Sequence, residues 1–163
     1  MTALTLRADE AAALWRDGAV VVRRKWAPPT DRVRGGVMDP ARAFERYDGL
    51  FEFRQTFDDG SFWRHVERCP LGSPGDRVWV REAHAIETWA NPRSGANVFY
   101  VADDTAKTFD AVPALGFVPE RDLCADRPAV TMPRWASRGD AVIASVEVEA
   151  EPWEWVVRVE VVR

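Results

Sequence analysis

Residues 142–161, VIASVEVEAEPWEWVVRVEV, alternate between apolar and polar side chains on both sides of Pro152. Before the proline, valines alternate with glutamates, and after it tryptophans and valines alternate with glutamate and arginine. Alternation with a period of two is typical of β-strands that bury one face. The segment therefore predicts a hairpin of two strands, 142–150 and 153–161.

Working outward, similar alternation and turn residues predict a mainly β chain with two short helices. The first helix starts near Asp9 and ends before Gly18. The second covers residues 40–47, with Asp39 as its N-cap and a proline at its first helical position. The proline-containing residues 103–128 indicate a long surface excursion. Further strands are predicted at 19–22, 50–54, 61–66, 77–81 and 97–101. We expect 77–81 and 97–101 to join the C-terminal hairpin in one curved sheet or barrel.

Length and composition favour a single domain over residues 1–163. The chain is 47% hydrophobic and 29% charged, which is typical of a globular protein. It has no apolar run of the roughly 18 residues that a spanning helix needs, and the first residues lack a signal-peptide core. We therefore predict a cytoplasmic protein with no membrane partner. Two cysteines, too few for a disulfide scaffold, fit a reducing compartment.

Charge is distributed unevenly along the chain. The net charge of −4 argues against a general polyanion binder. Residues 16–34 nevertheless carry six basic and two acidic side chains, and residues 127–138 carry three arginines and no acidic side chain. Such patches can meet phosphate groups, although scattered charges on a solvated surface are the simpler interpretation for either segment alone.

A zinc site is a further possibility that the residue types raise. Its ligands would be His65, Cys69, His84 and Cys124. The first two have helical spacing, but Cys124 has no second ligand near it in the sequence. The sequence therefore predicts neither a metal nor a cofactor.

Four segments in order resemble the motifs of one protein family. They are 69–82 (CPLGSPGDRVWVRE), 99–103 (FYVAD), 132–138 (MPRWASR) and 152–156 (PWEWV). Together they resemble a family of phage and prophage proteins with a PUA-like, ASCH-type domain. The resemblance implies a PUA-like β-barrel with two short helices, a nucleic-acid or nucleotide ligand and, for a phage protein, the host cytoplasm.

The N-terminal motif of that family is only partly present. Residues 14–24 supply Arg23 and Arg24, but Ala19 stands where the family has a lysine, and valines stand at its threonine positions. Relatives that hydrolyse acylated cytidine or cut RNA are implied to use that lysine, a threonine and a glutamate. Only the glutamate, Glu82, remains. We therefore expect binding rather than turnover, with an amidohydrolase or ribonuclease that uses Glu82 as the alternative.

The predicted site binds a nucleotide, a modified base or a short RNA or DNA. Its residues are expected to converge on one cleft: Arg23, Arg24, Glu82, Arg134, Trp135 and Arg138. In this interpretation Trp135 stacks on a base, the arginines contact phosphate and Glu82 accepts hydrogen bonds from an exocyclic amine.

Three alternatives to this site stay open. Trp135 can belong to the core, as is expected of Trp79, Trp153 and Trp155 on their patterned strands. Arg134 or Arg138 can form a structural ion pair with Asp76 or Glu82. Another protein can also be the partner, with exposed tryptophans as anchors.

Overall fold

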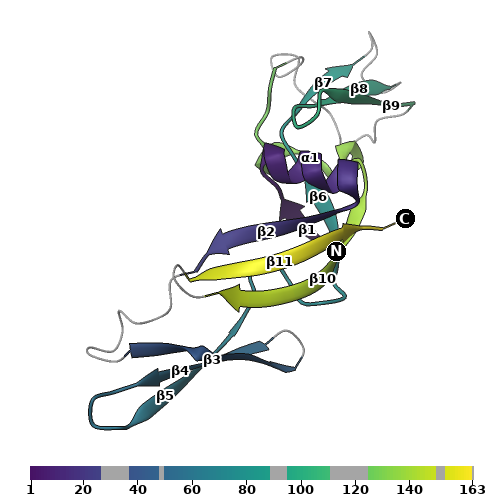
Figure 1. Ribbon diagram of the computed structural model, residues 1–163. Helices are drawn as coiled ribbons and strands as arrows, with labels where there is room; N and C mark the ends of the chain where they lie inside the picture. The colour runs from purple at the N-terminus through teal and green to yellow at the C-terminus, as the bar shows by residue number, and fades with distance from the viewer. Residues whose placement is uncertain (27–36, 48–49, 89–94, 111–124, 150–152, 163) are drawn as a thin grey trace. The chain divides into compact units, whose positions relative to one another are not determined.

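The computed structural model describes residues 1–26, 37–47, 50–88, 95–110, 125–149 and 153–162 (Figure 1). These residues form eleven strands, one α-helix and two short 3-10 helices. In chain order they are β1 (Thr2–Thr5), α1 (Ala8–Asp17), β2 (Ala19–Lys25), β3 (Val37–Tyr47), β4 (Leu50–Thr56), β5 (Phe62–Arg68), β6 (Arg77–Arg81), β7 (His84–Thr88), β8 (Ala96–Tyr100), β9 (Thr105–Phe109), η3 (Ala129–Thr131), η4 (Arg134–Ala136), β10 (Asp140–Glu149) and β11 (Glu154–Val161).

The strands form three sheets. Their orders are β1-β6-β10-β11-β2, β3-β4-β5 and β7-β8-β9. Strand β1 runs parallel to β6, whereas the two three-stranded sheets are antiparallel. The C-terminal strands β10 and β11, the hairpin β4–β5 and strand β6 confirm the sequence predictions for those segments. None of the described helices has the length and hydrophobicity needed to cross a membrane.

The predicted barrel is wrong. All three sheets are open, and no closed barrel is present among the described residues. Strand β8 was expected beside the C-terminal hairpin but lies between β7 and β9 in a separate sheet. Part of the predicted surface excursion 103–128 is the strand β9, which pairs with β8. The alternation of apolar and polar residues along a strand shows which face is buried, but it does not specify which strand lies next to it. The neighbours of β8 therefore could not be predicted from its own residues.

The predicted helix at 40–47 is also wrong, because these residues lie in strand β3. Backbone pairing with β4 is shifted between Asp39 and Phe44, and Pro40 falls within that irregularity. A proline has no N–H to donate, and is tolerated in a sheet at an edge strand or a bulge. Strand β3 is an edge of its sheet, so pairing with β4 overrides the local capping signal.

Helix α1 forms where it was expected. The backbone N–H of Arg7 donates to the Glu10 carboxylate at 2.9 Å, which satisfies a group that the helix itself leaves unpaired. At the other end Gly18 adopts a left-handed conformation with φ of 80°, and its N–H donates to Leu14 O. Glycine adopts this conformation without steric cost, so the helix ends there.

The chain folds into two compact units. Unit 1 comprises Met1–Val20, Arg77–Ala141 and Glu160–Arg163, and unit 2 comprises Val21–Asp76 and Val142–Val159. Unit 1 has a core cluster of Ile86, Ala96, Val98, Tyr100, Met132 and Ala136. The expectation of a single domain stays a prediction.

The core of unit 2 is aromatic. The rings of Trp26 and Phe53 are 4.2 Å apart, and those of Phe51 and Trp155 are 5.1 Å apart. Trp155 is fully buried, which confirms its predicted place in the core. Trp153 is half-buried and packs edge-on against Trp26 and Phe53.

At two glycines of unit 2, Gly72 and Gly75, the cost of backbone strain can be measured separately from the cost of steric overlap. Both have positive φ, 128° at Gly72 and 88° at Gly75. A Cβ at Gly72 would lie 2.7 Å from Ile143 Cδ1, whereas one at Gly75 would meet nothing within 4 Å. We expect Gly75→Ala to lower the free energy of unfolding by about 1 kcal/mol, from the backbone alone.

Because Gly72→Ala adds an overlap with a buried side chain, we expect it to cost about 1–3 kcal/mol more than Gly75→Ala. Urea denaturation of both variants measures the difference. Equal losses for the two variants would contradict the proposed overlap at Gly72.

Candidate functional site

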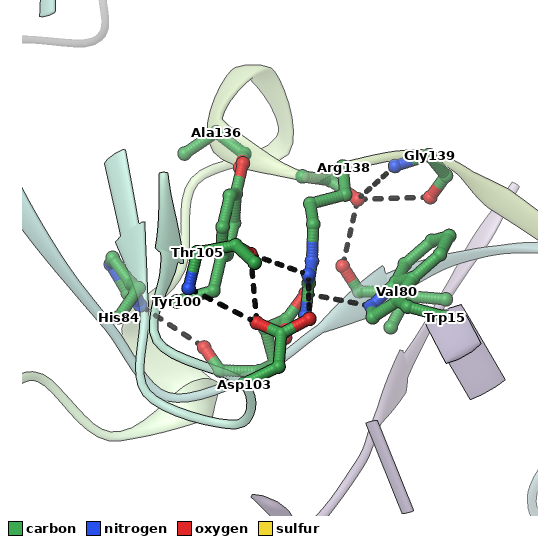
Figure 2. A network of polar contacts seen from close by, with 11 residues as sticks. Trp15, Val80, His84, Tyr100, Asp103, Thr105, Ala136, Arg138 and Gly139 are labelled. Atoms are coloured by element: carbon green, nitrogen blue, oxygen red, sulfur yellow. Dashed lines mark hydrogen bonds and ion pairs between the residues drawn. The ribbon is translucent and has the colours of Figure 1, made fainter. Parts of the chain in front are cut away.

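The polar network of unit 1 centres on Arg138, which follows η4 (Figure 2). Its guanidinium group contacts Glu82, which directly follows β6, and Asp103 and Thr105 from the β8–β9 turn. Figure 2 shows Tyr100 and Thr105 on one side of the Arg138 side chain and Trp15 of α1 on the other. The network therefore joins segments that are far apart in the sequence.

Glu82 is fully buried, and both of its carboxylate oxygens are bonded. Oε1 accepts hydrogen bonds from Trp15 Nε1 at 3.0 Å and from Arg138 Nε at 2.9 Å. Oε2 accepts from Arg138 Nη2, so the ion pair is bidentate. A buried carboxylate needs this complete pairing because its desolvation is costly.

The second carboxylate of the network is Asp103. Arg138 Nη1 donates to Asp103 Oδ2 at 2.6 Å and to Thr105 Oγ1 at 2.9 Å. The Thr105 hydroxyl donates to Asp103 Oδ1 at 2.7 Å. Burial by itself would raise the pKa of Asp103, but the hydrogen bonds from Arg138 and Thr105 outweigh it and lower that pKa. Burial would lower the pKa of Arg138, but its two carboxylates raise it, so the arginine stays charged.

Aromatic and hydroxyl groups fix the segment that carries Arg138. The guanidinium carbon lies 4.3 Å from the centre of the Tyr100 ring, and the Tyr100 hydroxyl donates to Ala136 O at 2.9 Å. Burial, with the nearby charge of Glu82, raises the pKa of Tyr100, so it remains a neutral donor. The Ser137 hydroxyl bonds Val80 O at 2.8 Å. These contacts hold η4 and the residues after it in place.

His84 is fully buried at the start of β7. Its Nδ1 lies 3.1 Å from Glu82 O, and because a carbonyl only accepts, Nδ1 carries the proton. Its Nε2 has no hydrogen-bond partner among the described residues. Burial lowers the pKa of His84, so the ring is neutral at pH 7.

The structure brings two of the predicted site residues into direct contact. Glu82 and Arg138 form the structural ion pair that the sequence left open as an alternative to ligand binding. Arg134 donates to Asp140 Oδ1 at 2.6 Å. Trp135 is half-buried against the core cluster, and its ring meets that of Phe109 edge-on with centroids 5.5 Å apart.

The other two predicted site residues, Arg23 and Arg24, belong to unit 2. Arg23 forms ion pairs with Glu149 and, at 3.5 Å, with Glu154. Convergence of all six residues on one cleft stays a prediction.

Sequence reasoning missed a second group of residues on β6. Val78 and Val80 are buried, so Arg77, Trp79 and Arg81 share the opposite face of the strand. The guanidinium groups of Arg81 and Arg134 lie over the Trp79 ring, 5.6 and 5.5 Å from its centre. We call Arg77, Trp79, Arg81 and Arg134 the β6 surface. The alternation of residues 77–81 was the available signal for three of these residues, but the position of Arg134 depends on tertiary structure.

The potential zinc ligands do not form a cluster in the part of the chain that is described. No group of three or more His, Cys, Asp or Glu side chains there is arranged to hold a metal ion. His65 Nε2 instead lies 3.1 Å from Gln55 Oε1. Cys124 lies outside the described residues.

Comparison of the chain with protein-family models, curated proteins and solved structures found no match.

The buried ion pair can be tested by removing one or both partners. Arg138→Met leaves Glu82 charged and unpaired in the interior, and we expect it to lower the free energy of unfolding by about 3–5 kcal/mol. The double variant Glu82→Leu with Arg138→Met should lose less than the sum of the single variants, with a coupling of about 1 kcal/mol or more. Urea denaturation measures all three.

The exposed pair Arg16–Asp17 supplies the matched control. Arg16→Met should leave the free energy of unfolding nearly unchanged, because water screens this exposed pair. Additive losses from Glu82→Leu and Arg138→Met would show that the two charges do not depend on each other.

His84 should make the protein less stable in mild acid. Between about pH 6.5 and pH 5 the unfolded chain binds a proton at this histidine, whereas the folded chain, with its lowered pKa, does not. The free energy of unfolding therefore falls as the pH falls, by up to about 1.4 kcal/mol per pH unit. We expect His84→Gln to have a flatter pH dependence in denaturation curves over that range. An unchanged slope would contradict the assignment.

Proposed function

We propose that this protein binds a nucleotide or a short nucleic acid at the β6 surface and does not hydrolyse it. The observation that carries the proposal is the position of the Arg81 and Arg134 guanidinium groups over the Trp79 ring. Trp79 is half-buried and packs against the core cluster of unit 1, as its strand pattern predicted. Arginines beside the remaining part of such a ring can combine a phosphate contact with a surface on which a base can stack.

The charge of the β6 surface favours an anionic ligand. Three arginines face one carboxylate, Asp140, which pairs with both Arg77 and Arg134. The hydrogen bond from Arg134 is the main cause of the lowered pKa of Asp140, so this carboxylate stays ionised. Arg81 donates to a carbonyl, Val130 O at 3.2 Å, and has no carboxylate partner within the described ranges. The surface therefore keeps a positive charge that can attract phosphate.

The polar network around Arg138 holds in place the segment that carries Arg134 of the β6 surface. Arg134 precedes Arg138 by four residues in the segment that Tyr100 and Ser137 hold in place. A binding group on a fixed backbone loses less conformational entropy when the ligand binds. The ion pair between Arg138 and Glu82 thus has a positioning role in the proposed function.

Hydrolysis receives less support than binding. A general base must reach the proton that it removes, but Glu82 has no exposed surface and both of its oxygens are bonded. Neither lysine supplies the missing cation at Glu82 within unit 1: Lys107 Nζ donates to Arg138 O at 3.4 Å, and Lys25 belongs to unit 2.

The sequence motifs add the biological setting to the proposal. Their resemblance to phage and prophage proteins favours a phage-derived protein acting in the host cytoplasm, with RNA, DNA or a modified nucleotide as the ligand. A protein partner is the alternative class, and lack of nucleotide binding together with capture of a defined protein partner would favour it.

Binding at the β6 surface predicts a specific pattern of losses. A thermal-shift panel of nucleosides, nucleotides and short oligonucleotides identifies the ligand, and calorimetric titration then gives its affinity. We expect phosphate-bearing ligands to bind more tightly than the matching nucleosides. Arg81→Gln should weaken binding by about tenfold or more, since a hydrogen bond to a charged group contributes about 1.5–3 kcal/mol. Arg16→Gln, in the same unit but paired with Asp17, is the control.

Equal affinities of Arg81→Gln, Arg16→Gln and the unaltered chain would contradict a site at the β6 surface. Multiple turnover of N4-acetylcytidine or of RNA, abolished in Glu82→Gln, would instead support the enzyme alternative.

A further inference from the structure

The hairpin β4–β5 of unit 2 packs Phe51 and Phe53 of one face against the aromatic core of the unit, and its other face carries Arg54, Arg64 and Arg68. Phe51, Phe53 and Gln55 of β4 are buried, and Glu67 of β5 accepts a hydrogen bond from Trp26 Nε1 at 2.6 Å on that same face. The pairing register places Phe62 opposite Thr56, Arg64 opposite Arg54, Val66 opposite Glu52 and Arg68 opposite Leu50 on the other face. We call Arg54, Phe62, Arg64, Val66 and Arg68 the β5 surface.

The β5 surface exposes large apolar side chains. Phe62 is 40% exposed and Val66 is 47% exposed. Each of them is two residues away from Arg64, which lies between them on the same face. Exposed apolar side chains arranged together with charged ones are typical of interaction sites.

Arginine side chains cover part of the exposed aromatic ring. The Arg54 guanidinium carbon lies 3.7 Å from the centre of the Phe62 ring, and that of Arg64 lies 5.6 Å from it. Aromatic rings and guanidinium planes are the two kinds of protein surface on which unpaired bases stack. The cluster presents both at one place on the sheet.

The charges of this face are only partly balanced. Its three arginines face one acidic residue of β4, Glu52, which lies 3.5 Å from Arg64 Nε in a long ion pair. Within the described part of the chain, neither Arg54 nor Arg68 has a carboxylate partner. The β4 and β5 side chains on this face, three arginines and Glu52, therefore sum to a charge of +2 in a chain of net charge −4. Charges more than about 10 Å away are largely screened at physiological salt, so the local sign decides what binds.

We propose that the β5 surface binds single-stranded nucleic acid. A base stacks on Phe62 and the Arg54 guanidinium, and the backbone phosphates lie on Arg64 and Arg68. Bases in a duplex are already stacked and paired, so a flat sheet face that binds by stacking selects single strands. This surface lies in unit 2, uses none of the residues of the β6 surface and goes beyond the function proposed above.

Fluorescence anisotropy with the full chain tests the proposal. The probes are fluorescein-labelled 15-mers of deoxythymidine and of uridine, and a labelled 15-base-pair DNA duplex. We expect both single strands to bind more tightly than the duplex. For two or three phosphate contacts, the logarithm of the binding constant should fall with the logarithm of salt with a slope of about −1.4 to −2. Tighter binding of the deoxythymidine or of the uridine strand would identify DNA or RNA as the preferred ligand.

A matched pair of phenylalanine variants isolates the stacking contact. Phe62→Ala should weaken single-strand binding by about fivefold or more, while Phe62→Tyr should keep it. Phe99→Ala is the control, because Phe99 is 42% exposed but lies in unit 1. Similar affinities of Phe62→Ala and Phe99→Ala would overturn the proposal, as would a duplex bound as tightly as the single strands.

The arginines are tested through the salt dependence. Replacing Arg64 and Arg68 together by glutamine should make the slope shallower by about 1.4, the contribution of two phosphates. Arg16→Gln, with a side chain 73% exposed in unit 1, should leave the slope unchanged. An unchanged slope in the double variant would overturn the placement of the phosphates.

Two outcomes separate this proposal from its competitors. Strand β5 is an edge of its sheet, so a second copy of the chain could pair with it. A dimer in sedimentation that Val66→Glu dissociates, with no strand binding by the unaltered chain, would overturn the proposal in favour of self-association. Phe62→Ala should weaken single-strand binding by the same factor with and without Arg81→Gln, so that failure at the β6 surface and failure at the β5 surface are distinguished.

Discussion

The ion pair between Arg138 and Glu82 is the contact on which the arrangement of unit 1 depends. A buried charge costs several kcal/mol in lost hydration unless it is paired and hydrogen-bonded. Here the bidentate contact, the Trp15 indole and Asp103 together satisfy both partners. Because these groups come from α1, the end of β6, the β8–β9 turn and the segment after η4, satisfying one charge places four segments at once.

This constraint also bears on the chemistry of the unit. The same bonds that make Glu82 tolerable in the interior occupy the lone pairs that a general base would need. The surfaces with unbalanced positive charge lie elsewhere, on the faces of β6 and β5. The proposed binding and the structural integrity of the unit thus depend on different side chains, so surface variants can be tested without disturbing the interior.

The two proposed surfaces arise from the same local geometry. In each, a strand buries alternate residues and leaves arginines beside an aromatic ring on the other face, at Trp79 in unit 1 and at Phe62 in unit 2. They differ in charge balance. Asp140 pairs with two arginines of the β6 surface at 3.0 Å or less, while the contact between Glu52 and Arg64 on the β5 surface is longer, at 3.5 Å. The second surface therefore relies more on unpaired arginines and should depend more strongly on salt.

The elements whose stability is local can be predicted from the sequence. Alternation identified β6, β10, β11 and the β4–β5 hairpin, and Gly18 marked the end of α1, because burial of one face and left-handed backbone leave a signature within a few residues. Only the tertiary structure shows that residues 40–47 pair with β4 rather than form a helix, that β8 lies between β7 and β9, and that Glu82 pairs with Arg138 in the interior. Strand partners and charge neutrality depend on groups distant in the chain, such as Arg138 and Glu82, 56 positions apart.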